Sequence, residues 1–283
     1  PAAELETRMA PRTEARTVNA AEFPGGGEYR GEPGSELGTE LGAEFNAELG
    51  TESLGEFPDI TRPDAGVALV STRHAGSPQA QRAAARATLA ARRALPWPDG
   101  LLSFSFYTGT DGAAVMAYAQ WTHRGASLRH AAAHGPVMIR GVGESDDDLA
   151  RSEPLVFRRY RTIGPGRSST AVPACIATPL FDVDGPERQR TIIDTLLAGP
   201  LARPLPGLVA AHFHFSTCGT RILNYAEWTS EELHERSLHS ATLQEAGATT
   251  RATPGVRGVG CPRYRLAWSL AAPGAERPAR TPE

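Results

Sequence analysis

Residues 207–229 read GLVAAHFHFSTCGTRILNYAEWT, and residues 100–122 read GLLSFSFYTGTDGAAVMAYAQWT. The two stretches align without a gap and share nine identities in 23 positions. Each consists of two runs rich in apolar and aromatic residues, joined by a short segment that carries Asp111-Gly112 in the first copy and Cys218-Gly219 in the second. This arrangement is typical of a β-hairpin. Its recurrence predicts an internal duplication of the chain.

The flanks of the two hairpins also match. The segment SPQAQR at 77–82 aligns with GPERQR at 185–190, and the triplet RYR occurs at 159–161 and again at 263–265. Ser77 followed by Pro78 indicates a helix start, because serine caps a helix well and proline is favoured in the first turn. Each repeat therefore reads as strand, helix, two strands, helix, strand.

The expected boundaries follow from these runs. In the first repeat we expect strand 67–72, helix 81–95, hairpin strands 101–108 and 113–121, a weaker helix after Trp121, and closing strand 155–163. In the second repeat we expect strand 172–181, helix 186–199, hairpin strands 208–216 and 220–228, helix 230–244 with Thr229 and Glu232 as its capping box, and closing strand 260–270.

A unit of about 100 residues with this order is a ferredoxin-like split βαβ fold. The sequence thus predicts an α+β protein of two tandem ferredoxin-like units, residues 61–168 and 169–272. Residues 1–60 contain a glutamate at every fourth position from 28 to 56, with frequent glycines, which opposes a helix and predicts a disordered acidic tail. Residues 273–283 are predicted to be a second disordered tail.

Composition excludes several classes of function. All 29 basic side chains are arginine, so a phosphate-binding loop with its lysine, a pyridoxal Schiff base and a lysine general base are all excluded. The sequence contains no basic stripe interleaved with aromatic residues, which is the pattern that would predict nucleic-acid binding. No apolar run has the roughly 18 residues that a membrane helix needs. The three cysteines are widely spaced, which favours free thiols in a cytoplasmic protein.

The order of these motifs resembles the antibiotic biosynthesis monooxygenase superfamily, in its two-repeat actinobacterial members. The motifs are the helix start GPxxQR, the hairpin that begins GLxxxHFHxS, the strand end NYAxW and the terminal RYRL, and they cover about residues 66–270. The resemblance implies a dimeric α/β barrel, which a tandem chain can form internally as a monomeric pseudo-dimer, or as a homodimer of such chains.

The resemblance also suggests a pocket. Asn224 and Trp228 are four residues apart on a strand and point to one face. In the small cofactor-independent oxygenases of the superfamily, an Asn and a Trp at this spacing line the substrate pocket. Asn224 would then hydrogen-bond a substrate oxygen and Trp228 would stack on an aromatic ring. Core packing is the alternative for Trp228, because its twin Trp121 recurs. Asn224 does not recur, since Ala117 stands in its place, so we expect the active pocket in the second repeat.

Histidines supply the candidate acid–base groups. His212 and His214 alternate with phenylalanines and share one face; Tyr107 is the counterpart of His214 in the first repeat. Two such imidazoles could accept a proton from a phenol, although a satisfied buried pair is the alternative. No third ligand follows at metal spacing, so no metal site is predicted. His234 stands where the related oxygenases have a substrate-contacting tyrosine.

The resulting hypothesis is a monooxygenase that oxidises an aromatic polyketide-type phenol or anthrone with dioxygen in antibiotic biosynthesis, without a bound cofactor. Its catalytic candidates are Asn224, His212, His214 and His234, and its substrate-binding candidates are Trp228, Trp121 and Tyr107. Two alternatives stay open: an oxygenase that uses reduced flavin from a partner reductase, and a ligand-binding barrel without catalysis.

Overall fold

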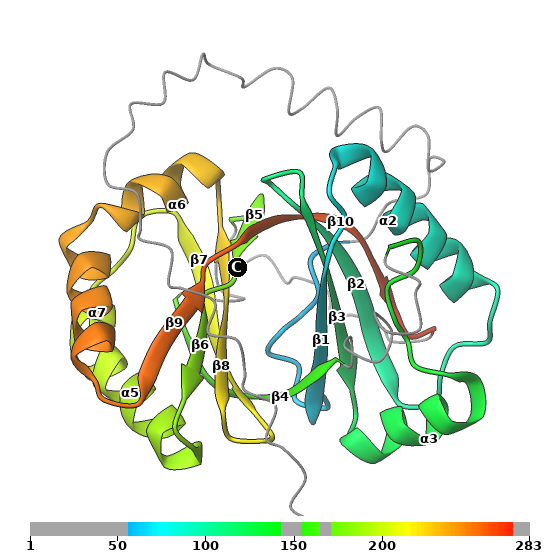
Figure 1. The fold of residues 1–283 in the computed structure, drawn as a ribbon, viewed down its shortest axis with the longest axis horizontal. Helices are drawn as coiled ribbons and strands as arrows, with labels where there is room; N and C mark the ends of the chain where they lie inside the picture. The colour runs from blue at the N-terminus through cyan, green and yellow to red at the C-terminus, as the bar shows by residue number, and fades with distance from the viewer. Residues whose placement is uncertain (1–55, 143–153, 165–170, 274–283) are drawn as a thin grey trace, which may run out of the picture. The chain divides into compact units, whose positions relative to one another are not determined.

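The computed structural model describes residues 56–142, 154–164 and 171–273, which all belong to one compact unit, Leu49–Glu283 (Figure 1). Residues 1–55 of the predicted tail 1–60, and residues 274–283 of the second predicted tail, lie outside the described residues. At the start of the described part, Ile60 is buried and Gln120 donates a hydrogen bond to the Asp59 carbonyl. This short segment therefore packs on the first repeat.

Both repeats have the predicted order of elements. The first contains β1 (Val67–His74), α2 (Pro78–Arg93), β2 (Leu101–Gly109), β3 (Ala114–Trp121), α3 (Arg124–His134) and β4 (Leu155–Ile163). The second contains β5 (Cys175–Ala177), β6 (Leu180–Val183), α5 (Pro186–Ala198), the short 3-10 helix η2 (Pro200–Ala202), β7 (Leu208–Ser216), β8 (Arg221–Trp228), α6 (Glu231–Leu238), α7 (Ala241–Ala252), β9 (Val256–Gly260) and β10 (Arg263–Ala271).

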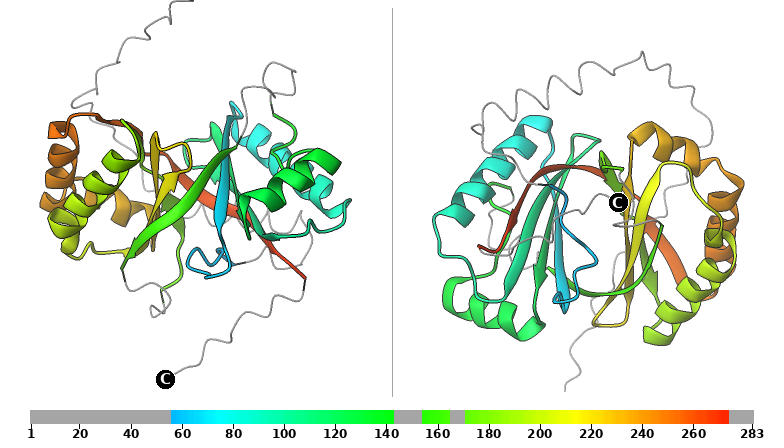
Figure 2. Two further views of the ribbon diagram at one scale, coloured as in Figure 1. Left: turned by 90° about the horizontal axis from the view of Figure 1, so that it is seen from below. Right: turned by 180° about the vertical axis from the view of Figure 1, so that it is seen from behind.

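The strands form a closed antiparallel barrel. Hydrogen-bonded pairs run in a ring β10-β2-β3-β1-β4-β7-β8-β5, and β5 pairs with β10 to close it. Strands β6 and β9 extend this ring beside β8. The helices lie outside the strands, with α2 and α3 on the first half and α5, α6 and α7 on the second (Figures 1 and 2). The predicted fold class, two tandem ferredoxin-like units forming one barrel, is confirmed.

The closing strand of each repeat pairs mainly with the other repeat. Strand β4 pairs with β1 over only three residues and then runs along β7, whereas β10 runs along β2 over most of its length. Each closing strand thus lies beside the first strand of its own repeat, as expected, and its longer pairing with the other repeat is an exchange that the sequence did not predict. Without the exchange β2 and β7 would each leave an unpaired sheet edge, which proteins avoid. Trp268 of β10 completes the exchange, because its indole N–H donates to the Ala85 carbonyl of α2 at 3.0 Å.

The first strand of the second repeat is interrupted. The prediction of one strand over 172–181 is corrected to β5 and β6, separated by Thr178 and Pro179. Proline has no N–H and cannot donate to a sheet ladder. The neighbouring groups bond across the interruption instead: the Thr178 N–H donates to the Pro262 carbonyl, and the Asn224 N–H donates to the Pro179 carbonyl, both at 2.9 Å.

Serines fix the helix ends of the second repeat. The predicted helix 230–244 is two helices, α6 and α7, because Ser240 accepts from the Leu243 N–H and starts a new helix. The predicted cap Thr229 is also wrong by one position, since the Ser230 side chain accepts from the Leu233 N–H at 3.1 Å. In the first repeat the predicted cap Ser77 is confirmed, with its hydroxyl accepting from the Ala80 N–H.

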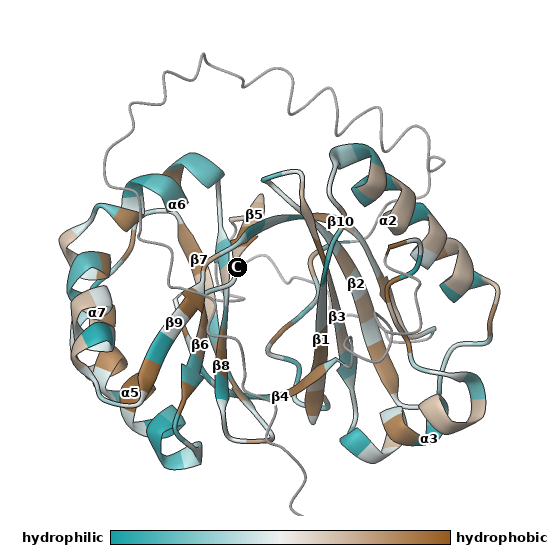
Figure 3. Ribbon diagram, viewed as in Figure 1, coloured by the Kyte–Doolittle hydropathy of each residue, from teal (hydrophilic) through white to brown (hydrophobic). Residues whose placement is uncertain are grey.

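The sheet separates two packed layers. The barrel interior is shared by both repeats and contains Ile60, Ala68, Val70, Tyr107, Met116, Tyr118, Phe157, Ile176, Leu223, Tyr225 and Tyr264. The helix-facing layer of the second repeat contains Cys175, Ala177, Ile192, Ile193, Leu196, Ala211, Phe213, Ile222, Ala226, Trp228 and Ala246. Apolar residues accordingly follow the strands, and α6 is largely hydrophilic (Figure 3). Any residue on a strand can therefore be assigned to one layer by its alternation.

A buried glutamine recurs at the start of the first helix of each repeat, and its hydrogen bonds explain the recurrence. Gln81 of α2 donates from Nε2 to the carbonyls of Gly109 and Ala114, which flank the first hairpin turn. Gln189 of α5 donates to the carbonyls of Ser216 and Arg221 at the second turn. In each repeat one amide thus ties the helix to the hairpin.

Replacing Gln81 by alanine is expected to lower the free energy of unfolding by about 2 kcal/mol, because two buried carbonyls lose their donor. Chemical denaturation of the variant and the parent measures this difference. Gln79→Ala is the matched control, since Gln79 is exposed on the same helix and should change stability by less than about 0.5 kcal/mol. Equal effects of the two substitutions would contradict the proposed tie.

Candidate active site

Strand β8 presents Asn224 and Trp228 to the helix-facing layer of the second repeat. Ile222, Ala226 and Trp228 all belong to that layer, and Asn224 alternates with them. The two side chains therefore share a face, as the strand periodicity predicts. Helix α6 follows directly after Trp228 and places His234 against it, with the two ring centroids 5.1 Å apart and the ring planes at 67°.

These three residues leave polar atoms without partners. Asn224 Oδ1, Trp228 Nε1 and His234 Nδ1 are buried, and none has a hydrogen-bond partner in the described part of the chain. Buried polar atoms are bonded in the great majority of protein sites, so each exception needs a reason. Three exceptions in one layer, from β8 and α6, indicate a place that a polar ligand can complete.

Small side chains separate Asn224 from Trp228. On β8, Ala226 lies between them, and it pairs with Ala177 of β5 on one side and Ala211 of β7 on the other. The three methyl groups form a flat strip across the sheet. Asn224 and Trp228 lie about 13 Å apart along the strand at the usual rise of ~3.3 Å per residue. The strip is itself covered, because the three alanines are at most 4% exposed and belong to one packed cluster with Ile192 and Leu196.

His234 has the character of a neutral base. Burial lowers its pKa, and the Arg263 guanidinium lowers it further, while Glu235 acts weakly in the opposite direction. The imidazole is therefore uncharged near neutral pH and able to accept a proton at its unpartnered Nδ1. Its Nε2 lies 4.0 Å from the Cys261 thiol.

His212 and His214 lie on the opposite side of the sheet. Their neighbours Ala211 and Phe213 occupy the helix-facing layer, so the two imidazoles point into the barrel interior. The hypothesis that they deprotonate a substrate held by Asn224 is thereby corrected, because the β-sheet stands between them. The physical reason is the register: His214 pairs with Leu223, and His212 with Tyr225, both of which alternate with Asn224.

The interior histidines are satisfied by a hydrogen-bond network instead. His214 Nδ1 donates to the His212 carbonyl at 2.8 Å, so its Nε2 accepts from the Tyr118 hydroxyl at 3.0 Å. His212 Nδ1 bonds with the Thr162 hydroxyl at 3.0 Å, and its Nε2 lies 3.9 Å from Glu227 Oε2. Burial lowers the pKa of His214 to about 3, so this imidazole is neutral.

The two remaining candidates are also separated from Trp228. Tyr107 is fully buried in the barrel interior, where its hydroxyl bonds with that of Tyr225 at 2.7 Å and burial raises its pKa. Trp121 lies in the helix-facing layer of the first repeat, 5.9 Å from the His130 ring. The structure thus joins Asn224, Trp228 and His234 and leaves the other candidates apart.

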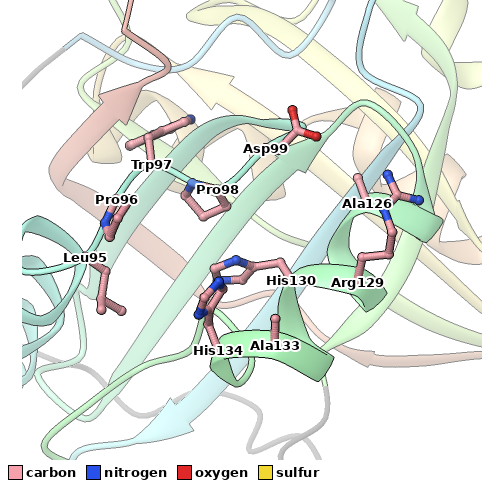
Figure 4. Close-up of a pocket in the computed structure, with 10 residues that line it drawn as sticks. All are labelled: Leu95, Pro96, Trp97, Pro98, Asp99, Ala126, Arg129, His130, Ala133 and His134. Atoms are coloured by element: carbon pink, nitrogen blue, oxygen red, sulfur yellow. The ribbon is translucent and has the colours of Figure 1, made fainter.

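A pocket of about 240 Å³ opens in the first repeat (Figure 4). The segment between α2 and β2 forms one wall and α3 forms the other, and the lining residues are Leu95, Pro96, Trp97, Pro98, Asp99, Ala126, Arg129, His130, Ala133 and His134. Sequence reasoning identified none of them. The signal available was the spacing of His130 and His134, which places both on one face of a helix.

Metal and membrane features are limited in the described residues. In the ranges 56–142, 154–164 and 171–273, no three His, Cys, Asp or Glu side chains gather where they could hold a metal ion. No helix within these ranges is both long enough and apolar enough to cross a bilayer.

Comparison with known proteins gives one local sequence match and a fold match. Tetracenomycin-F1 monooxygenase of Streptomyces glaucescens is 46% identical over 57 residues, which are 19% of this chain and 50% of that protein. The chain thus spans about half the length of this curated relative. The crystal structure of an anthrone oxidase-like protein aligns over 77% of this chain and 98% of its own, with a TM-score of 0.55 and 16% identity. No family model matches.

A further solved structure, a monooxygenase of Streptomyces coelicolor in complex with nanaomycin D, covers 40% of this chain and 98% of its own, at 23% identity and a TM-score of 0.29. The fold of this chain is thus a tandem ferredoxin-like barrel, and its local match in sequence is to a monooxygenase. Both findings agree with the resemblance to the antibiotic biosynthesis monooxygenase superfamily.

Proposed function

We propose that this chain is a monooxygenase that oxidises an aromatic phenol or anthrone with dioxygen, at the helix-facing layer of its second repeat and without a bound cofactor. The observation that carries the proposal is the set of buried, unpartnered atoms Asn224 Oδ1, Trp228 Nε1 and His234 Nδ1. Together they offer an acceptor, a donor and a base to one ligand.

Each side chain has a distinct role in this reaction. His234 Nδ1 accepts the proton that an anthrone loses from its methylene carbon, or a phenol from its hydroxyl. The Trp228 N–H donates to the oxyanion that forms, which stabilises it strongly in a site shielded from water. The Asn224 carboxamide binds a second oxygen of the ligand, about 13 Å along the strand from Trp228, and so orients the ring system.

The electrons come from the substrate. An anthrone carbanion transfers an electron to dioxygen, the resulting radicals combine into a C–O bond, and the hydroperoxide loses water to leave a quinone. One anthrone and one O₂ thus give one anthraquinone and one H₂O, with no external reductant. The protein supplies binding, proton transfer and electrostatic stabilisation.

The local match to a tetracenomycin-F1 monooxygenase supports the reaction class. The substrate and the absence of a cofactor rest on the site chemistry alone. Reduced flavin delivered by a reductase is the competing source of electrons, and ligand binding without turnover is the competing role of the barrel.

Oxygen uptake by the purified chain on a hydroxyanthrone, which carries the second oxygen assigned to Asn224, tests the proposal, with and without reduced flavin mononucleotide. We expect uptake without flavin and one anthraquinone formed for each O₂ consumed. The control is the same anthrone with His234→Ala, which should consume oxygen at nearly the uncatalysed rate. Oxygen uptake that requires flavin would contradict the cofactor-independent mechanism and favour the flavin-dependent alternative. Saturable binding of the substrate with no oxygen uptake in either condition would refute catalysis.

A further inference from the structure

We infer that the pocket of the first repeat is a second, non-catalytic ligand site that binds an aromatic carboxylate. It is separate from the proposed catalytic layer, because all ten of its lining residues belong to the first repeat. Ala117 replaces Asn224 there, and Ser127 stands at the position of His234. The first repeat therefore lacks the polar acceptor and the base that the proposed reaction uses.

The wall formed by residues 95–99 is held rigidly. The Trp97 indole N–H donates to the Leu101 carbonyl at 2.6 Å. The Arg92 guanidinium donates to the Leu95 and Pro96 carbonyls and lies over the Trp97 ring at 5.8 Å. A wall fixed in this way loses little conformational entropy when a ligand binds.

The pocket surface suits an aromatic ring. Trp97 and Pro98 line one side, and His130 of α3 lies on the other (Figure 4). Beneath His130 lies Trp121, whose ring centroid is 5.9 Å away. Trp121 is 1% exposed, and its Nε1 has no hydrogen-bond partner among the described residues. A ring that enters between the two walls can stack on Trp97 and His130, which line the pocket.

The charges around the pocket favour an anion. Helix α3 contributes Arg129, His130 and His134, whereas Asp99 is the one acidic residue in the lining. No hydrogen bond or ion pair of Arg129 occurs in the described part of the chain. The pKa of His130 is lowered by burial and then by the neighbouring His134 and Arg92, so this imidazole is neutral near pH 7 and Arg129 is the group that would meet an anion. A planar carboxylate matches the guanidinium fork of Arg129.

In the second repeat, packed side chains occupy the position that corresponds to the pocket. Ser237 and Ala241 stand where His130 and His134 stand in the first repeat, and Leu205 replaces Pro98. Helix α7 also packs against η2 and α5 there, and Leu201 and Leu205 join the core. The described residues that follow α3, 135–142, form no such helix. The duplication has thus kept one fold while the two repeats have acquired different sites.

Calorimetric titration with 1-hydroxy-2-naphthoate tests the inference, in the Asn224→Ala background so that the proposed catalytic layer does not contribute. We expect saturable binding that Arg129→Gln weakens about tenfold, the usual size for loss of a charged hydrogen bond. Arg236→Gln changes the equivalent residue of the second repeat and should have no effect. Ala133→Trp, at an exposed position in the lining, should block binding without disturbing the core.

Two further probes distinguish the contribution of the aromatic ring to binding from that of the carboxylate charge. Neutral 1-naphthol should bind at least tenfold more weakly than the naphthoate, and acetate should not bind measurably. The inference is overturned if the naphthoate does not bind, or if Arg129→Gln and Arg236→Gln weaken it equally. Both results are independent of oxygen uptake, so the ligand site and the proposed reaction can fail separately.

Discussion

Asn224→Ala is expected to lower the rate of oxygen uptake at least tenfold while leaving the stability of the protein unchanged or slightly higher. The amide oxygen is buried and makes no hydrogen bond among the described residues, so its removal takes away an unsatisfied group and no hydrogen bond within the fold. A residue that supports only the fold would show the reverse pattern. The rate falls because the ligand loses the group that orients it, and misplacement of a reacting group costs a factor of ten to a hundred.

Steady-state oxygen uptake and thermal melting of the same preparations measure the two effects. Ala117→Asn is the matched control, because it places the same amide at the equivalent position of the first repeat, where no base corresponds to His234. We expect this variant to keep the parent rate. Asn224→Ala with full activity would remove the second repeat from the proposal, and a gain of activity in Ala117→Asn would show that the first repeat can also catalyse.

Most of the fold follows from local signals. The repeat predicted two ferredoxin-like units, and Ser77, Gly112 and the hairpin runs lie where the structure has a helix cap, a turn and strands. The errors share a cause. Exchange of β4 and β10 depends on which sheet edge is free after folding, and the interruption at Pro179 depends on an acceptor, the Pro262 carbonyl, that lies 83 residues away. Neither is encoded in a local window.

The site was predictable in part for the same reason. Strand periodicity assigned Asn224 and Trp228 to one face, and the comparison of repeats singled out Asn224. The same periodicity placed His212 and His214 on one face of their strand. Whether that face is the one that carries Asn224 depends on how the strands pair, which periodicity does not show. His234 entered through its position after Trp228, and its contact with that ring depends on the packing of α6. The pocket at His130 depends on a loop wall that sequence periodicity does not describe.

The neutral His214 predicts a strong dependence of stability on pH. Burial is the main cause of its lowered pKa, and the neighbouring charges of His212 and Arg159 add to it, whereas two backbone hydrogen bonds act in the opposite direction. In the unfolded chain a histidine has a pKa of about 6.5. Between that value and about 3, the unfolded chain binds a proton at this residue and the folded protein does not. Stability therefore falls as the pH is lowered through this window.

The expected loss is large. Each pH unit in the window costs about 1.4 kcal/mol, which gives about 2 kcal/mol between pH 6.5 and 5 and about 5 kcal/mol at the lower limit. His214→Gln removes the titrating group and keeps an acceptor for the Tyr118 hydroxyl, so the variant should lose the part of the slope that His214 contributes and keep the smaller part from His234 and His130, whose pKa values are also lowered. Denaturant unfolding of both proteins from pH 7 to 5 measures the difference, in a range where most carboxylates stay ionised.

His74→Gln is the control, because His74 is exposed at the end of β1 and its replacement should leave the slope of the parent intact. A parent protein as stable at pH 5 as at pH 7 would mean that His214 is charged in the fold, and then it could not accept from Tyr118. The hydrogen bond from Tyr118 of β3 to His214 of β7, which joins the two repeats in the barrel interior, would then be absent. The pH profile therefore tests whether a neutral imidazole joins the two repeats.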